Sequence, residues 1–212
     1  MKDQRRPVSW TLAHVTAAWA MCVGSGIVWI WVYKLTPGRS SSPPVRWPDS
    51  VQLARSGTTL IVTLHPLCSC SEATISELSR VLAGVPETLT VYALFHDFGN
   101  DEQGRPVADI KRSALWRRVS SVPHVTALVD RDGHIADRFG AETSGDVMAY
   151  SAQGELLFHG GLTPARGHEG DSLGRERLLA VLRGRSPDKR DSLVFGCDLH
   201  DPTSQRPEPL PN

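Results

Sequence analysis

The sequence carries no net charge, and no internal repeat is visible in it. Its 23 lysine and arginine residues balance 23 aspartate and glutamate residues. A protein that binds a polyanion usually has a basic excess, so the composition gives no reason to expect a nucleic-acid partner. With 212 residues, 40% of them hydrophobic, the chain is long enough for one ordinary domain plus accessory segments.

Cysteine is scarce, with four residues in the chain. Cys22 lies in an apolar stretch, which leaves Cys68, Cys70 and Cys197 for the rest of the chain. Three is an odd number, so a disulfide bond between any two of them leaves one thiol over. A surplus thiol of this kind fits thiol exchange or metal ligation better than a purely structural disulfide.

Charged side chains are absent from residues 7–33, a run rich in Val, Ala, Ile and Trp. About 20 apolar residues cross the hydrocarbon of a bilayer, and tryptophans near both ends suit its interfaces. The basic residues before the run favour a cytoplasmic N-terminus. We therefore expect residues 1–8 in the cytoplasm, a single-pass anchor at 9–33 in a bacterial inner membrane, and a soluble domain in the periplasm. A cleaved signal peptide is the alternative, but no good small-x-small site follows the run.

Residues 34–56 are rich in Pro and Ser without periodicity, which predicts a semi-extended spacer. A globular domain is expected at 57–184, followed by a tail at 185–212 that contains Cys197. The domain is predicted to be α/β, with the order β-α-β-α-β-α-β-β-α, and hence a mixed sheet with helices on both faces. The predicted strands are 58–64, 89–95, 125–129, 146–151 and 155–159, and the predicted helices are 71–83, 107–119, 132–139 and 173–182.

The first strand runs directly into a helix, and two cysteines lie at that junction. The apolar run ends at His65-Pro66, and helical periodicity begins after Cys68 and Cys70, where Ser69 or Ser71 is expected to act as the cap. Backbone N–H groups and the helix dipole stabilise a thiolate at a helix start and lower its pKa. Cys68 is therefore the candidate nucleophile, and His65 is the candidate that assists proton transfer.

The resolving thiol is either Cys70 or Cys197. A Cys-x-Cys disulfide closes a small, strained ring that is easily reduced. Cys197 ends an apolar island, Leu-Val-Phe-Gly-Cys, in an otherwise Pro-rich tail. The island is expected to dock on the domain, either close to Cys68 or only as an anchor for the tail.

Metal binding is the main rival for the same residues. Thiolates and imidazole together suit copper(I) or zinc. Cys68, Cys70 and Cys197, joined by His65 or His168, would supply such a ligand set. We otherwise expect no cofactor.

His168 belongs to a Gly-rich loop at 161–172 that also contains Arg166 and Glu169. Long polar loops often carry function, so these three residues are expected to order a substrate, dock the tail or complete a metal site. Asp171 or Ser172 is expected to cap the helix that follows. By contrast, we interpret His96, at the end of the second strand, as a solvated loop residue.

The element order, with a cysteine at the end of the first strand, resembles the thioredoxin fold, as does Ala-x-x-Phe-Gly at 136–140. More narrowly, four motifs resemble those of the bacterial RedB proteins, a thioredoxin-like group. They are His-Pro-x-Cys-x-Cys-Ser at 65–71, Phe-Gly-Ala-x-Thr-Ser-Gly at 139–145, Gly-Gly-x-Thr-x-x-Arg-Gly-His-x-Gly-Asp at 160–171 and Phe-Gly-Cys at 195–197. The cysteines and the apolar run, taken with this resemblance, favour a membrane-anchored thiol–disulfide oxidoreductase that acts on a thiol or disulfide of a partner protein.

The sequence also departs from the thioredoxin pattern. Ser71 stands where a thioredoxin has its second cysteine, Gly145 falls near the position of the cis-proline, and Val62 falls near that of the buried acid. These departures argue against ordinary thioredoxin-type reductase activity. They leave a third hypothesis open, in which the fold is a redox-inactive binding scaffold.

Overall fold

The computed structural model describes residues 10–85, 89–100, 104, 106 and 108–200, and the chain divides into two units, Met1–Leu35 and Thr36–Asn212. The expected cytoplasmic residues 1–8 and the end of the tail, 201–212, lie outside the described residues. The described part of the first unit is helix α1, Trp10–Leu35, whose large apolar side chains are exposed. By length and composition this helix is able to cross a membrane.

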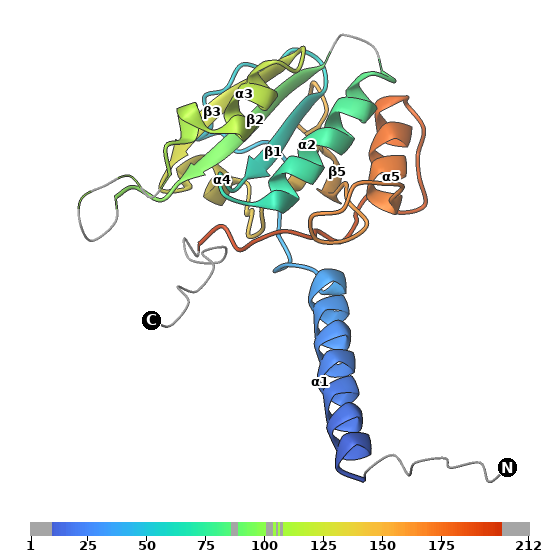
Figure 1. Cartoon of the computed structure of the whole chain (residues 1–212). Coiled ribbons are helices and arrows are strands. Elements are labelled where there is room, and N and C mark those ends of the chain that lie inside the picture. Colours follow the sequence, from blue (N-terminus) through green and yellow to red (C-terminus); the bar gives the residue numbers. More distant parts are fainter. Residues whose placement is uncertain (1–9, 86–88, 101–103, 105, 107, 201–212) are drawn as a thin grey trace, which may run out of the picture. The chain divides into compact units, whose positions relative to one another are not determined.

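The second unit is built around a five-stranded sheet with the order β3-β2-β1-β4-β5 (Figure 1). Strands β1, β2 and β3 are parallel, whereas β4 is antiparallel to β1 and β5 is antiparallel to β4. The strand bounds are β1 Thr59–Leu64, β2 Thr90–Asp97, β3 Val125–Arg131, β4 Asp146–Tyr150 and β5 Leu156–Gly161. The C-terminal end of β1 therefore lies beside the start of β4, where the expected Thr-Ser-Gly motif ends.

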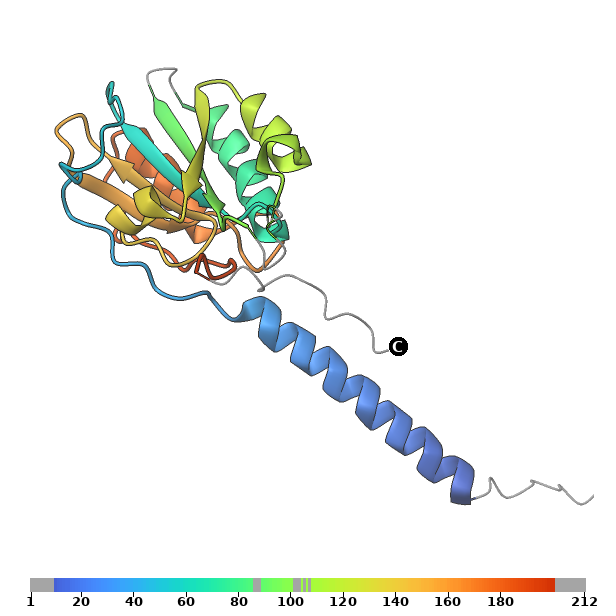
Figure 2. The same ribbon diagram turned by 90° about the vertical axis from the view of Figure 1, so that its left-hand side faces the viewer.

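Helices cover both faces of this sheet (Figures 1 and 2). One core contains alternate β1 residues such as Leu60 and Val62, packed with apolar residues of α2, α3 and α5. The other contains Ile61 with residues of α4 and of the segment before β1. The predicted mixed sheet with helices on both faces is confirmed. The helices are α2 Ser69–Leu82, η1 Ile110–Arg112, α3 Ala114–Ser120, α4 His134–Arg138 and α5 Leu173–Leu182.

The helix predicted at 107–119 is divided in the structure. A 3-10 turn, η1, ends before Ser113, which has an extended backbone with φ −63° and ψ 152°. The Ser113 hydroxyl accepts a hydrogen bond from the Trp116 backbone N–H at 3.0 Å and so caps α3. Ser113 thus starts a new helix. Its side chain accepts the hydrogen bond of a backbone N–H that would bond to a backbone carbonyl if one helix continued through Ser113.

The segment before β1, predicted to be a spacer, packs against the domain instead. Figure 2 shows this blue-to-teal segment running along the domain before it enters β1. Trp47 and Val51 are buried, and the Trp47 ring meets Phe139 and Tyr150 edge-on at centroid distances of 5.0 and 5.4 Å. The Tyr150 hydroxyl donates a hydrogen bond to the Pro44 carbonyl at 3.0 Å. The apolar side chains drive this packing, although Pro and Ser dominate the composition.

Candidate functional site

Three cysteine sulfurs meet in the interior of the second unit. Cys68 and Cys70 come from the β1–α2 junction, and Cys197 comes from the tail. The Cys68 and Cys197 sulfurs are 2.8 Å apart, and all three sulfurs lie within 4.8 Å of one another. The three residues are only 2–3% exposed. No disulfide bond joins the three cysteines in this structure.

The β1–α2 junction places Cys68 at the N-terminus of α2. Cys68 is the N-cap residue, with φ −106° and ψ 123°, and its carbonyl accepts the Ser71 backbone N–H at 3.0 Å. The expected serine caps of this helix are therefore wrong. The Ser71 hydroxyl instead accepts the His65 backbone N–H at 3.0 Å, which fixes the turn after β1.

The tail reaches the cluster by pairing with the loop before β4. Ser144 donates its backbone N–H to the Cys197 carbonyl at 2.8 Å, and the Cys197 N–H donates to the Ser144 hydroxyl at 2.9 Å. That hydroxyl also donates toward the Cys68 sulfur at 3.6 Å. A Cβ on Gly196 would lie 1.7 Å from the Ser144 carbonyl oxygen, so only glycine allows this close approach. Ser144 and Gly196 lie in two of the motifs given above, but no local pattern in the sequence marks them as positioning residues.

The Gly-rich loop docks the tail, which is one of the roles expected for it. The Arg166 guanidinium donates to the Gly196 carbonyl and, at 3.0 Å, to the Thr36 carbonyl. His168 is exposed, and its Nδ1 lies 2.8 Å from the Arg166 carbonyl oxygen. Within the described residues, the close group of metal-ligand atoms contains the three sulfurs and does not include His168. Ser172 caps α5, as expected, by accepting the Arg175 N–H.

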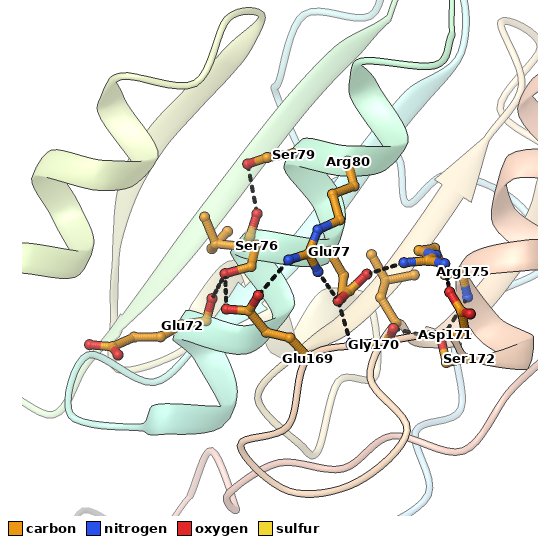
Figure 3. Close-up of polar contacts among 12 residues, drawn as sticks. Glu72, Ser76, Glu77, Ser79, Arg80, Glu169, Gly170, Asp171, Ser172 and Arg175 are labelled. Atoms are coloured by element: carbon orange, nitrogen blue, oxygen red, sulfur yellow. Dashed lines mark hydrogen bonds and ion pairs between the residues drawn. The ribbon is translucent and has the colours of Figure 1, made fainter.

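A buried carboxylate holds this loop against α2 (Figure 3). Glu77, in α2, is fully buried and accepts hydrogen bonds from Arg175 and from the Gly170 backbone N–H, both at 2.7 Å, and also from Arg80. Glu169 accepts a second hydrogen bond from Arg80 at 2.7 Å. Loop, α2 and α5 are thereby joined beside the cysteines. The signal for this contact in the sequence is a glutamate on the apolar face of an amphipathic helix, and it was not predicted.

The sulfurs perturb one another's pKa values in opposite directions. Hydrogen bonds from Cys197 and then from Cys70 lower the pKa of Cys68, and these bonds outweigh the effect of burial. Hydrogen bonds with Cys68 and then with Cys70, together with burial, raise the pKa of Cys197. The hydrogen bond with Cys197 lowers the pKa of Cys70, but the bond with Cys68 and burial leave that pKa raised. The cluster therefore favours one thiolate, at Cys68, surrounded by two thiols that keep their protons.

His65 is fully buried, and its Nδ1 accepts the Leu67 backbone N–H at 3.2 Å. The neutral ring therefore carries its proton on Nε2. A proton-transfer role for His65 stays a prediction. The solvated role expected for His96 is wrong, because that side chain is 6% exposed. Burial, followed by the charges of His200 and His65, lowers the pKa of His96 to about 4.

Comparison with known proteins gives a fold but no family. No protein-family model matches the chain, and no curated protein matches it. A hypothetical protein from Sinorhizobium meliloti aligns with a TM-score of 0.51 and 21% identity, covering 78% of this chain and 94% of that one. An uncharacterized conserved protein from Geobacillus kaustophilus aligns with a TM-score of 0.51 and 17% identity, covering 78% and 92%.

A thioredoxin lipoprotein of Streptococcus pneumoniae aligns less closely, with a TM-score of 0.43 and 15% identity over 61% of this chain and 85% of that one. The fold is assigned from the topology, which has two parallel β-α-β steps followed by an antiparallel hairpin and a final helix. The fold is thioredoxin-like. Cys68 follows β1 and is the N-cap residue of α2, and the tail brings a further cysteine to it.

Proposed function

We propose that the protein is a thiol–disulfide oxidoreductase whose redox pair is Cys68 and Cys197. The observation that carries the proposal is the 2.8 Å contact between these two buried sulfurs. A disulfide bond is about 2.05 Å long, so a small movement of the tail would join them. The contact favours Cys197 over Cys70 as the resolving thiol, and Cys70 remains as a third thiol within 4.8 Å.

The reaction proceeds by two exchanges. The Cys68 thiolate attacks one sulfur of a partner disulfide, so that a mixed disulfide forms and the partner's other sulfur leaves as a thiolate that takes up a proton. Cys197 then loses its proton and attacks the Cys68 sulfur, which releases the second partner sulfur as a thiol. The partner gains two electrons and the protein becomes the Cys68–Cys197 disulfide. A dithiol reductant restores the reduced protein, and the reverse sequence oxidises a partner dithiol.

Cys68, Ser144 and His65 each have a chemical task in this scheme. Hydrogen bonding keeps Cys68 as the thiolate, which is the attacking form. The Ser144 hydroxyl contacts both the Cys68 sulfur and the Cys197 backbone, and so holds the two reacting groups together. His65, at the same turn, assists proton transfer when Cys197 ionises.

The partner reaches Cys68 when the tail moves aside. Cys68 is only 2% exposed, and the Cys197 segment covers it. The tail is held there by hydrogen bonds from Ser144 and Arg166 to its carbonyl groups. Displacement of this segment exposes the Cys68 sulfur, and its return supplies the resolving thiol.

The proposal extends to location. Helix α1 anchors the chain in the inner membrane, its basic N-terminus stays in the cytoplasm, and the thioredoxin-like domain faces the periplasm. An oxidising compartment suits a disulfide-forming cluster. The four motifs at 65–71, 139–145, 160–171 and 195–197 support a close relationship to the RedB proteins.

A limiting amount of an aromatic disulfide, 5,5′-dithiobis(2-nitrobenzoate), tests the exchange. The full-length protein in detergent, with Cys22→Ser to remove the exposed thiol of α1, should release both nitrothiobenzoates of each reagent molecule as Cys197 resolves the mixed disulfide. Cys197→Ala should release one and retain the other on Cys68. If Cys197→Ala still releases both, Cys70 is the resolving thiol. If Cys68 never forms a mixed disulfide, the oxidoreductase proposal fails and the binding scaffold remains.

A further inference from the structure

Cys70 is neither the attacking nor the resolving thiol in a redox pair formed by Cys68 and Cys197, yet its sulfur belongs to the same buried group. The three residues are 2–3% exposed, and their sulfurs span no more than 4.8 Å. Among the described residues these sulfurs form the group of closely spaced ligand atoms that suits a metal ion. Two sulfurs would suffice for a disulfide, so the third indicates a further use of the cluster.

The spacing of the sulfurs matches a three-coordinate site. Sulfur ligands lie about 2.3 Å from a bound d¹⁰ ion such as zinc, so three of them in a plane around an ion of that size are about 4 Å apart. The Cys68 and Cys197 sulfurs are 2.8 Å apart and all three sulfurs lie within 4.8 Å of one another, so a spacing of about 4 Å falls within the limits of the cluster. Cys197 lies on the tail, so a shift of about 1 Å there opens the short contact.

We propose that the reduced protein binds one copper(I) ion through Cys68, Cys70 and Cys197. Soft thiolate ligands select copper(I) or zinc. Zinc takes a fourth ligand, which is a protein side chain in structural sites and water in catalytic ones. The close ligand group contains no fourth side chain among the described residues, and the site is buried from water. Copper(I) is satisfied by three sulfurs in such an enclosed site.

Polar groups around the cluster offset the negative charge of the bound thiolates. The N-terminus of α2 begins at Ser69, next to Cys68, and supplies the positive end of a helix dipole. The Arg166 guanidinium donates a hydrogen bond to the backbone carbonyl of Gly196, the residue before Cys197. The Ser144 hydroxyl donates toward the Cys68 sulfur. These groups stabilise an anionic copper–thiolate site without providing a further ligand.

Copper binding and the proposed disulfide exclude each other. Formation of the Cys68–Cys197 bond removes two of the three sulfur ligands, so oxidation by two electrons releases the ion. A bound ion in turn holds all three sulfurs and blocks the disulfide. The inference goes beyond the proposed function and does not depend on it, because binding requires only the reduced cluster.

The test is an anaerobic copper(I) titration of the reduced full-length protein in detergent, against the copper(I) chelator bathocuproine disulfonate. We expect one copper per chain, with X-ray absorption that shows sulfur neighbours alone. Binding should be lost in Cys68→Ser and Cys197→Ser, and weakened at least about tenfold in Cys70→Ser. Cys22→Ser and His168→Ala serve as matched controls and should bind as the parent protein does.

The proposal is overturned if the chelator removes all copper from the parent protein, or if Cys70→Ser binds copper as tightly as the parent does. A nitrogen neighbour that disappears in His168→Ala would also overturn the three-sulfur set. Preferential retention of zinc with a fourth, non-sulfur neighbour would overturn the copper assignment. Cys70→Ser separates the two proposals, because it should keep the two-step exchange while it loses copper affinity. Failure of the exchange with intact copper binding would refute only the redox function.

Discussion

Gly196→Ala should release the tail from the cluster. The added Cβ would lie 1.7 Å from the Ser144 carbonyl oxygen, a clash with backbone that cannot be relieved in place. The least costly response is local undocking of the tail, which gives up the burial of Leu199 and the two hydrogen bonds between Ser144 and Cys197. Burial of a leucine contributes about 1.5–3 kcal/mol and each hydrogen bond about 0.5–1.5 kcal/mol. The docked tail is therefore held by about 3–6 kcal/mol before its ordering entropy is subtracted.

The consequence is measurable as the rate at which Cys197 is alkylated. Each 1.4 kcal/mol is a factor of ten in an opening equilibrium, so a net docking free energy of about 1.4 kcal/mol, after the ordering entropy is subtracted, already protects Cys197 about tenfold in the parent protein. Iodoacetamide labelling of the reduced full-length protein, quenched at intervals and mapped by mass spectrometry, should show most of this protection lost in Gly196→Ala. Gly84→Ala is the matched control, because the nearest atom to its Cβ would be the flexible end of Arg183, at 3.2 Å, and the other neighbours lie at ordinary contact distances of 3.5 and 3.8 Å. Equal labelling rates in Gly196→Ala and the parent protein would refute the docked-tail geometry.

Three further predictions follow from the site and its surroundings. Cys197→Ala removes the hydrogen bond that most lowers the pKa of Cys68, so the midpoint of the pH–rate profile for Cys68 alkylation should move upward, and an unchanged midpoint would contradict the assigned cause. Glu77→Ala leaves Arg175 without its buried carboxylate partner and should lower the free energy of unfolding in urea by about 3 kcal/mol, whereas exposed Glu176→Ala should change it by less than about 0.5 kcal/mol. The pKa of His96 is lowered by burial to about 4, so the unfolded chain binds more protons than the native one between about pH 4 and 6.5. Stability should therefore fall as the pH drops through that window, by up to about 1 kcal/mol per unit, and His96→Phe should flatten the dependence.

The sheet could be predicted from the sequence because its signals are local. Apolar strands that alternate with helical periodicity gave the order of elements, and the helix at 173–182 was predicted with the bounds that α5 has. Local signals gave wrong predictions at two places, where a single side chain determines the structure against the surrounding sequence pattern. Ser113 divides the predicted helix by capping α3. The side chain of Trp47 is buried in a core cluster, so the Pro/Ser-rich segment packs against the domain.

The cysteines could be recognised as candidates from the sequence, but their clustering in the folded chain could not be predicted. The position of Cys197 depends on contacts between residues far apart in sequence, above all the approach of Gly196 to Ser144. The Glu77 network depends likewise on Arg175, which lies 98 residues further along the chain. No periodicity encodes such pairs, because they form only once α2, the Gly-rich loop and the tail are packed together.

The most direct test of the central claim is disulfide mapping. The full-length protein should be equilibrated anaerobically in glutathione buffers of increasing potential, alkylated at low pH, digested and examined by mass spectrometry. The Cys68–Cys197 pairing predicts that one cross-linked peptide pair joins these residues as the potential rises, while Cys70 is recovered alkylated. A Cys68–Cys70 linkage in its place would contradict the account, and so would alkylation of Cys68, Cys70 and Cys197 at every potential.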